Sequence, residues 1–181
     1  ITASGSFFVD VGCPSDPPNN FGGQAAIVEY FSRTTVGTSS VWCGVSNSFT
    51  KDSRAAASGW RSNALLTIAS GDEPMRRGCN NGETQLACEL RQAKPAFALI
   101  MIGTNDVDGI ANNDLTINDY KNRLTAIVDQ TQQAGTIPVL STIPPRLDHD
   151  GNLQDEVSQV NQAIIDVAQT KNIPVWNYWR A

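Results

Sequence analysis

The stretch 97–106 reads FALIMIGTND, an apolar run followed directly by four small or polar residues. A short continuous run of this kind is typical of a parallel strand that is buried on both faces of its sheet. The tetrad Gly103-Thr104-Asn105-Asp106 then lies at the carboxyl end of that strand. Because open α/β sheets bind ligands at the carboxyl ends of their strands, we expect the tetrad to belong to a functional site.

Two helices alternate with two further strands after this stretch. Apolar residues recur at helical spacing between 117 and 131, where Thr116 and Asp119 form a capping pattern and Gly135 ends the helix. The same spacing returns between 157 and 168, and the segments 137–142 and 173–176 predict strands. Since such crossovers are right-handed and join parallel strands, we expect an α/β fold with helices on both faces of a mostly parallel sheet.

The amino-terminal third of the chain has a less regular pattern. Prolines, glycines and asparagines crowd the segment 10–23, which predicts a long loop. The segment 24–31 predicts a helix, and the segment 32–46, rich in Thr, Val and Ser, suggests an extra hairpin.

The composition describes one acidic domain. The 181 residues correspond to about one domain by the usual size of domains, with a formal net charge of −5 and a pI near 4.7. Nucleic acids and anionic membranes attract basic surfaces, so we expect neither nucleic-acid binding nor membrane insertion. Charged residues make up 17% of the chain, below the roughly 25% of an average soluble domain, and the polar remainder is typical of secreted proteins.

Four cysteines bear on the cellular compartment. Cys13, Cys43, Cys79 and Cys88 form no Cys-x-x-Cys pair, which argues against a zinc site. Three disulfide pairings are open, and the turn-forming residues around 78–82 favour Cys79 with Cys88, which leaves Cys13 with Cys43. Disulfides favour a secreted or extracytoplasmic protein, and four buried free thiols are the alternative.

Several blocks of the sequence resemble the SGNH (GDSL-type) serine hydrolases. The tetrad is similar to the family's Gly-x-Asn-Asp block, in which the Asn amide donates to the oxyanion. The segment 47–60 resembles the block whose glycine supplies a backbone N–H, here Gly59, and the segments 138–146 and 175–180 resemble the next two strands. The resemblance implies a flavodoxin-like, three-layer α/β/α sandwich in which Gly59 and Asn105 form part of an oxyanion hole.

The resemblance also implies that two catalytic blocks lie beyond the chain. The opening residues ITASG resemble those that follow the family's Gly-Asp-Ser nucleophile block, and the family's Asp-x-x-His block is expected shortly after Ala181. We therefore expect residues 1–181 to be a single SGNH hydrolase-like domain that is truncated at both ends. The nucleophilic serine and the basic histidine would lie outside it, and the chain alone would be inactive.

Other candidate residues have simpler explanations. His149 is the single histidine and lies in an acidic polar loop, while Ser4 and Ser6 follow no Gly-Asp pair. Asp106 is expected to hydrogen-bond locally and hold the turn, without a role in proton transfer. The sequence contains no Gly-x-Ser-x-Gly elbow, no phosphate-binding glycine loop, no His-Glu-x-x-His helix and no EF-hand spacing, so it predicts neither a cofactor nor a metal.

The expected activity is ester hydrolysis through a serine acyl-enzyme. Short acyl esters are the first choice of substrate, with esters of carbohydrates foremost, and lipid esters and thioesters are alternatives. Gly-Thr-Asn-Asp is also compatible with an ordinary strand-ending turn. A non-catalytic carbohydrate-binding or cell-surface module on the same fold is the alternative function, and the sequence leaves the oligomeric state open.

Overall fold

The computed structural model describes residues 59–69, 78–146 and 153–180, together with 53–57 and Ala26, Glu29, Tyr30 and Arg33. The chain separates into two compact units, Ile1–Ser58 with Ser70–Arg77, and Gly59–Ala69 with Gly78–Ala181. In the first unit, the four isolated residues are helical; Ala26, Glu29 and Tyr30 agree with the helix predicted for 24–31, and Arg33 lies beyond its predicted end. The loop predicted for 10–23, most of the segment 32–46, and the cysteines at 13 and 43 lie outside the described residues.

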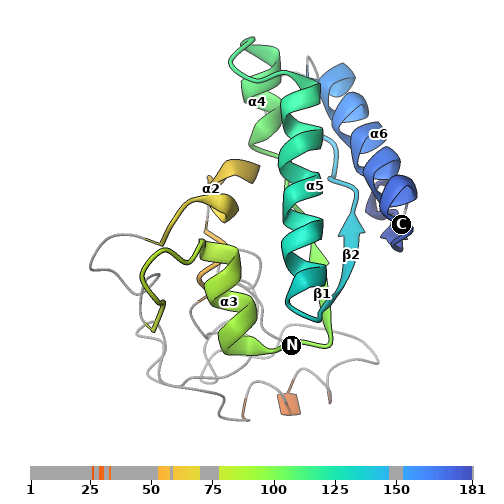
Figure 1. The fold of residues 1–181 in the computed structure, drawn as a ribbon. Helices are drawn as coiled ribbons and strands as arrows, with labels where there is room; N and C mark the ends of the chain where they lie inside the picture. The colour runs from red at the N-terminus through yellow and green to blue at the C-terminus, as the bar shows by residue number, and fades with distance from the viewer. Residues whose placement is uncertain are drawn as a thin grey trace. The chain divides into compact units, whose positions relative to one another are not determined.

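The second unit contains a parallel sheet and its crossover helices (Figure 1). Its elements are α2 (Ser62–Leu66), α3 (Gln85–Ala93), β1 (Phe97–Ile100), α4 (Asp106–Ala111), α5 (Ile117–Gln133), β2 (Ile137–Ser141), α6 (Gln154–Lys171), β3 (Val175–Trp176) and the 3-10 helix η4 (Tyr178–Arg180). The described strands lie in the order β1-β2-β3 and all pair in parallel. The predicted α/β class with a parallel sheet is confirmed.

The two long helices form where the apolar periodicity predicts them. At the start of α5 the Thr116 hydroxyl accepts a hydrogen bond from the Asp119 N–H at 3.1 Å, and the Asp119 carboxylate accepts one from the Thr116 N–H at 3.3 Å. This capping box satisfies N–H groups that have no partner inside the helix. The buried positions of α5 are Tyr120, Leu124, Ile127, Val128 and Thr131, and α6 buries Val157, Val160, Ile164, Val167 and Ala168 among others.

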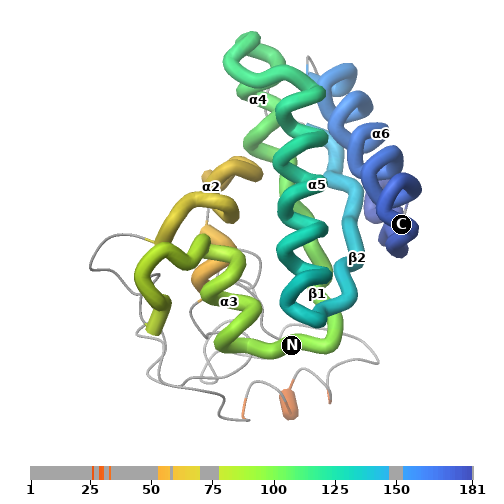
Figure 2. The backbone as a smooth tube through the Cα atoms, viewed as in Figure 1, coloured from red at the N-terminus to blue at the C-terminus, as the bar shows by residue number. Residues whose placement is uncertain are grey.

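Helices α5 and α6 lie on the same face of the sheet. They pack against each other and both contact β2, while α2 and α3 pack against α5 (Figure 2). Because the strand order is sequential, two right-handed crossovers step in the same direction and leave their helices on one side. The two crossovers therefore supply one helical layer of the α/β fold, formed by α5 and α6.

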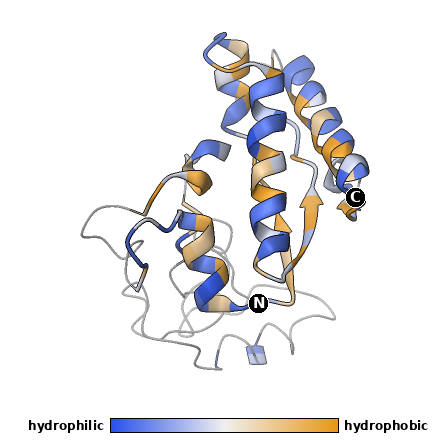
Figure 3. Ribbon diagram, in the orientation of Figure 1, coloured by the Kyte–Doolittle hydropathy of each residue, from blue (hydrophilic) through white to orange (hydrophobic). Residues whose placement is uncertain are grey.

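The other face of the sheet carries exposed apolar side chains. Phe97 and Leu99 on β1 are 64% and 56% exposed, and Ile137 opposite Phe97 is 49% exposed. Figure 3 shows the hydrophobic character of β1 and β2. The prediction that the strand is buried on both faces is wrong for Phe97 and Leu99, whereas Ile100 is buried.

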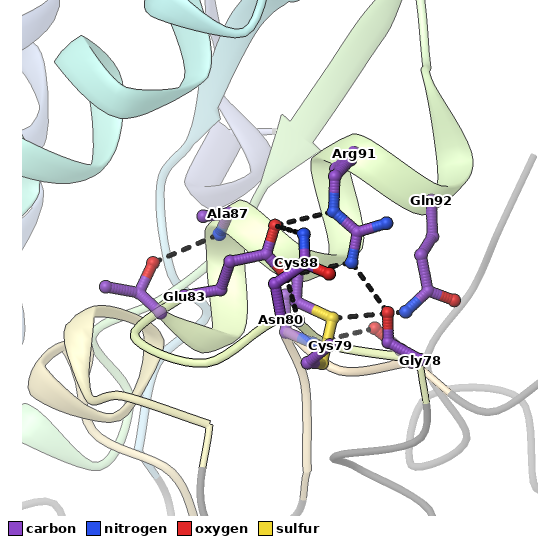
Figure 4. The surroundings of a disulfide bond; sticks show 11 residues. Gly78, Cys79, Asn80, Glu83, Ala87, Cys88, Arg91 and Gln92 are labelled. Carbon is purple, nitrogen blue, oxygen red and sulfur yellow. Dashed lines mark hydrogen bonds and ion pairs between the residues drawn. A yellow bond between two sulfur atoms is a disulfide. The ribbon is translucent and has the colours of Figure 1, made fainter.

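The disulfide predicted between Cys79 and Cys88 is confirmed, and it closes the loop before α3 (Figure 4). Glu83 holds the same loop, because its carboxylate accepts hydrogen bonds from the Asn80 N–H at 2.7 Å and from Arg91 Nε at 2.5 Å. Arg91 Nη2 also donates to the Gly78 carbonyl at 2.6 Å. The Arg91 guanidinium, with the Asn80 N–H, lowers the pKa of Glu83 from 4.5 to about 2.

The acid sensitivity of this loop follows from the Glu83 carboxylate. A lowered pKa in the folded protein means that Glu83 contributes stability above pH 4.5 and loses that contribution as the pH falls toward 2. We predict that Glu83→Gln lowers the free energy of unfolding at pH 7, and that the difference from wild type shrinks between pH 4.5 and 2. Urea unfolding at several pH values measures this difference. A difference that stays constant down to pH 2 would contradict the prediction.

The turn after β1 requires a glycine. Gly103 has a φ of +137°, and a Cβ at this position would lie 2.7 Å from the Tyr120 hydroxyl. We predict that Gly103→Ala lowers the free energy of unfolding by about 2 to 4 kcal/mol, because backbone strain and overpacking add. Gly135→Ala is the matched control, since φ is +77° there and no atom lies within 4 Å of the new Cβ. Urea unfolding should show a clearly smaller loss for Gly135→Ala, and equal losses would refute the steric explanation.

Candidate active site

The tetrad begins at a tightly packed strand exit. Tyr120 on α5 donates from its hydroxyl to the Ile102 carbonyl at 2.7 Å, directly before Gly103. The Gly103 carbonyl then accepts from the N–H groups of Asp106 and Val107, at 2.9 and 3.1 Å, as α4 begins. Burial, and secondly the charge of Asp106, raise the pKa of Tyr120 well above its ordinary value. The hydroxyl therefore stays protonated and continues to donate.

Asn105 connects the tetrad to the predicted second block. Its side-chain Nδ2 donates to the Trp60 carbonyl at 3.0 Å, across 45 positions of sequence. Gly59 directly precedes Trp60, so the structure brings both predicted oxyanion residues to the same part of the molecule. An ordinary strand-ending turn needs no such long-range partner.

Gly59 is exposed and has a φ of +79°. No atom lies within 4 Å of the place that a Cβ would occupy. The left-handed backbone therefore accounts for the glycine, and crowding by neighbouring atoms does not. An exposed backbone at this position leaves space for a ligand to approach.

Asp106 is fully buried and binds the beginning of α2. One carboxylate oxygen accepts from the Ser62 N–H at 2.8 Å, and the other accepts from the Ser62 hydroxyl at 2.6 Å. Arg123 Nη1 on α5 lies 3.8 Å from the same carboxylate. The expectation of a local hydrogen bond is wrong, because the partner is 44 residues away and the bond joins two segments.

The exit of β2 is tied to the same turn. Arg146 Nη1 donates to the Thr104 carbonyl at 2.8 Å and to Asp108 Oδ2 at 3.1 Å, and Arg146 Nη2 donates to Asp108 Oδ1 at 3.3 Å. Asn161 on α6 accepts from the Ile143 N–H at 2.8 Å and donates to the Ile143 carbonyl at 3.1 Å. The exits of β1 and β2 are thus fixed by side chains from α6 and from each other.

Arg146, Asn161 and Ser62 were not predicted to have a role in the site. Asn161 carried a signal, because it is a polar residue beside Val160 on the buried stripe of α6, where an amide needs partners. Arg146 and Ser62 stand among other polar residues, so nothing in their local sequence distinguishes them.

Three residues that were considered as catalytic candidates, Ser4, Ser6 and His149, lie outside the described part of the chain. The described residues therefore contain no histidine. Among them, the one group with metal-ligand proximity is Cys79, Glu83 and Cys88, and the disulfide occupies both sulfurs. None of the described helices is both long and apolar enough to cross a membrane.

The arrangement can stabilise negative charge on a ligand oxygen. It combines the side-chain amide of Asn105 at a strand exit with the backbone of Gly59, and hydrogen bonds hold Trp60 and Ser62, which follow Gly59, against that exit. Neutral N–H donors fixed in advance are what an oxyanion hole requires.

Comparisons with known proteins bear on the fold and on the family of the chain. Among solved structures, the chain is similar to Axe2, an acetylxylan esterase from Geobacillus stearothermophilus, with a TM-score of 0.52 and 16% identity, over 94% of this chain and 72% of that one. It is also similar to a G-D-S-L family protein from Desulfitobacterium hafniense DCB-2, with a TM-score of 0.48 and 16% identity, over 74% of this chain and 58% of that one. The chain thus spans less than two thirds of the length of the second protein.

The fold shared with Axe2 supports the α/β architecture, and the family follows from the sequence itself. No curated protein matches the chain. The profile of the GDSL-like Lipase/Acylhydrolase family matches residues 14–181, so the chain belongs to that family.

Proposed function

We propose that this chain carries the oxyanion-binding part of an ester hydrolase that works through a serine acyl-enzyme. The observation that carries the proposal is the hydrogen bond from Asn105 to the Trp60 carbonyl, which joins the two segments that would bind the oxyanion. Membership of the GDSL-like family supports ester hydrolysis as the reaction.

The geometry of Asn105 suits this role. A side-chain amide has two N–H bonds, and the Trp60 carbonyl accepts one of them at 3.0 Å. That bond fixes the plane of the amide and hence the direction of the second N–H. In the proposed mechanism the second N–H and the Gly59 N–H donate to the oxygen of the tetrahedral intermediate.

The reaction would proceed in two steps. A serine hydroxyl attacks the ester carbonyl, a histidine takes the hydroxyl proton and passes it to the departing alcohol, and the acyl group remains on the serine. Water then attacks the acyl-serine in the same way and releases the acid. We infer that this serine and this histidine belong to sequence beyond the chain, and that Gly59 and Asn105 stabilise the oxyanion in both steps.

Short acyl esters, foremost those of carbohydrates, are the proposed substrates. The similarity in fold to an acetylxylan esterase supports this class. The disulfide between Cys79 and Cys88 supports a secreted or extracytoplasmic protein, because disulfides persist in oxidising compartments. An extracellular enzyme would meet acylated polysaccharides there.

Replacing the Asn105 amide tests the proposed function. In the chain extended at both ends as its gene encodes, Asn105→Ala should lower kcat for p-nitrophenyl acetate by about 100-fold to 1000-fold, because one oxyanion donor is lost. KM should change little, since the interaction forms mainly in the transition state. Asn122→Ala is the control, because Asn122 is exposed on α5. An unchanged kcat for Asn105→Ala would refute the role of this residue.

The location of the nucleophile and base has its own test. The 181-residue chain alone should hydrolyse p-nitrophenyl acetate no faster than background, whereas the extended chain should be active. Activity of the 181-residue chain would refute the proposal that these two groups lie outside it. An extended chain that binds acetylated oligosaccharides without hydrolysing them would instead favour the non-catalytic module.

A further inference from the structure

Two consecutive residues, Asn105 and Asp106, hold two positions of the segment that contains Gly59. The Asn105 amide binds the Trp60 carbonyl at 3.0 Å. The Asp106 carboxylate binds both the N–H and the hydroxyl of Ser62, at 2.8 and 2.6 Å. The segment 59–62 is therefore attached to the strand exit at two points that are two residues apart.

The two attachments differ in burial and in strength. Asn105 is only half-buried, whereas Asp106 and Ser62 are both fully buried. Hydrogen bonds to an ionised carboxylate are roughly twice as strong as those between neutral groups. The bond to Trp60 fixes one point of the segment, and the bonds to Ser62 fix a second point.

We propose that Asp106 is the positioning residue of the oxyanion hole, acting through Ser62 on the segment that carries Gly59. This inference rests on the proposed function and deepens it. Asp106 would touch neither the substrate nor the reacting atoms. Its carboxylate would set the spacing of the two oxyanion donors before substrate binds.

The groups around Asp106 fit this role. Ser62 satisfies both carboxylate oxygens, and the Arg123 guanidinium lies 3.8 Å from one of them. A buried carboxylate with these partners is held in one orientation. Breaking any of these hydrogen bonds would leave a buried polar group without a partner, which is energetically costly. A general acid or base would instead need access to the substrate, which full burial denies.

The test is a double-mutant cycle in the chain extended at both ends as its gene encodes, assayed with p-nitrophenyl acetate. Asp106→Ala should lower kcat by about tenfold to a hundredfold, because a shift of about 1 Å in a positioning group costs that much. In the Asn105→Ala background the same change should lower kcat by less than about threefold, since one of the two donors whose spacing Asp106 sets is already absent. KM should stay nearly constant throughout.

Conservative variants separate positioning from stability. Asp106→Asn should retain more of kcat than Asp106→Ala, because an amide oxygen still accepts from the Ser62 N–H and its NH₂ can donate to the Ser62 hydroxyl. Asp129→Ala is the matched control. It removes a carboxylate that pairs with Lys171 at 2.6 Å near the end of α5, so it should lower stability and leave kcat unchanged.

Each outcome bears on one of the two claims. An equal loss of kcat from Asp106→Ala in both backgrounds, or no loss at all, would overturn the positioning role while leaving the proposed function intact. If Asn105→Ala itself leaves kcat unchanged, the proposed oxyanion role fails and the positioning role fails with it. Thermal unfolding confirms that each variant is folded at the assay temperature.

Ser62→Ala decides the question if Asp106→Ala does not fold. It removes only the hydroxyl bond at 2.6 Å and keeps the backbone N–H bond. It should lower kcat severalfold in the wild-type background and leave it unchanged in the Asn105→Ala background. The same factor in both backgrounds would overturn the proposal.

Discussion

The buried carboxylate of Asp106 is the constraint on which the arrangement of this site depends. A charge with no exposure to water is tolerated only where hydrogen bonds replace its solvation, and Ser62 supplies two of them. The carboxylate therefore dictates that the beginning of α2 meets the beginning of α4. The position of Trp60 beside Asn105 then follows from the chain connectivity.

Hydrogen bonds between side chains and the backbone also recur along the carboxyl ends of the strands. At the end of β2, Asn161 holds both polar groups of the Ile143 backbone. Beyond β3, the Trp179 N–H donates to the Thr142 hydroxyl at 2.9 Å. At this edge, side-chain hydrogen bonds add to the backbone hydrogen bonds that join the strands. Directional bonds limit small displacements, which an oxyanion hole must avoid if its donors are to act without reorganising.

The sequence predicted those features that depend on short stretches of chain. Apolar periodicity predicted α5 and α6 with their buried positions, and the turn residues around Cys79 favoured the disulfide that the structure contains. The common face of the two helices could not be predicted, because it depends on the direction in which successive strands are added to the sheet. The partner of Asp106 could not be predicted for a related reason: a hydrogen bond across 44 residues leaves no pattern in the local sequence. The resemblance of the sequence blocks to a known family did assign Gly59 and Asn105 to the same predicted site.

A buried anion beside the proposed oxyanion site poses an electrostatic problem. Asp106 directly follows Asn105, and an uncompensated carboxylate there would oppose the negative charge that develops on the substrate oxygen, the more so because the interior screens it poorly. Two features of the structure reduce this opposition. The Ser62 N–H and hydroxyl direct their positive ends at the carboxylate, and Arg123 places a full positive charge 3.8 Å from it. The carboxylate is thereby compensated within the fold, so in the proposed mechanism it can hold the backbone in place while the neutral donors act on the substrate.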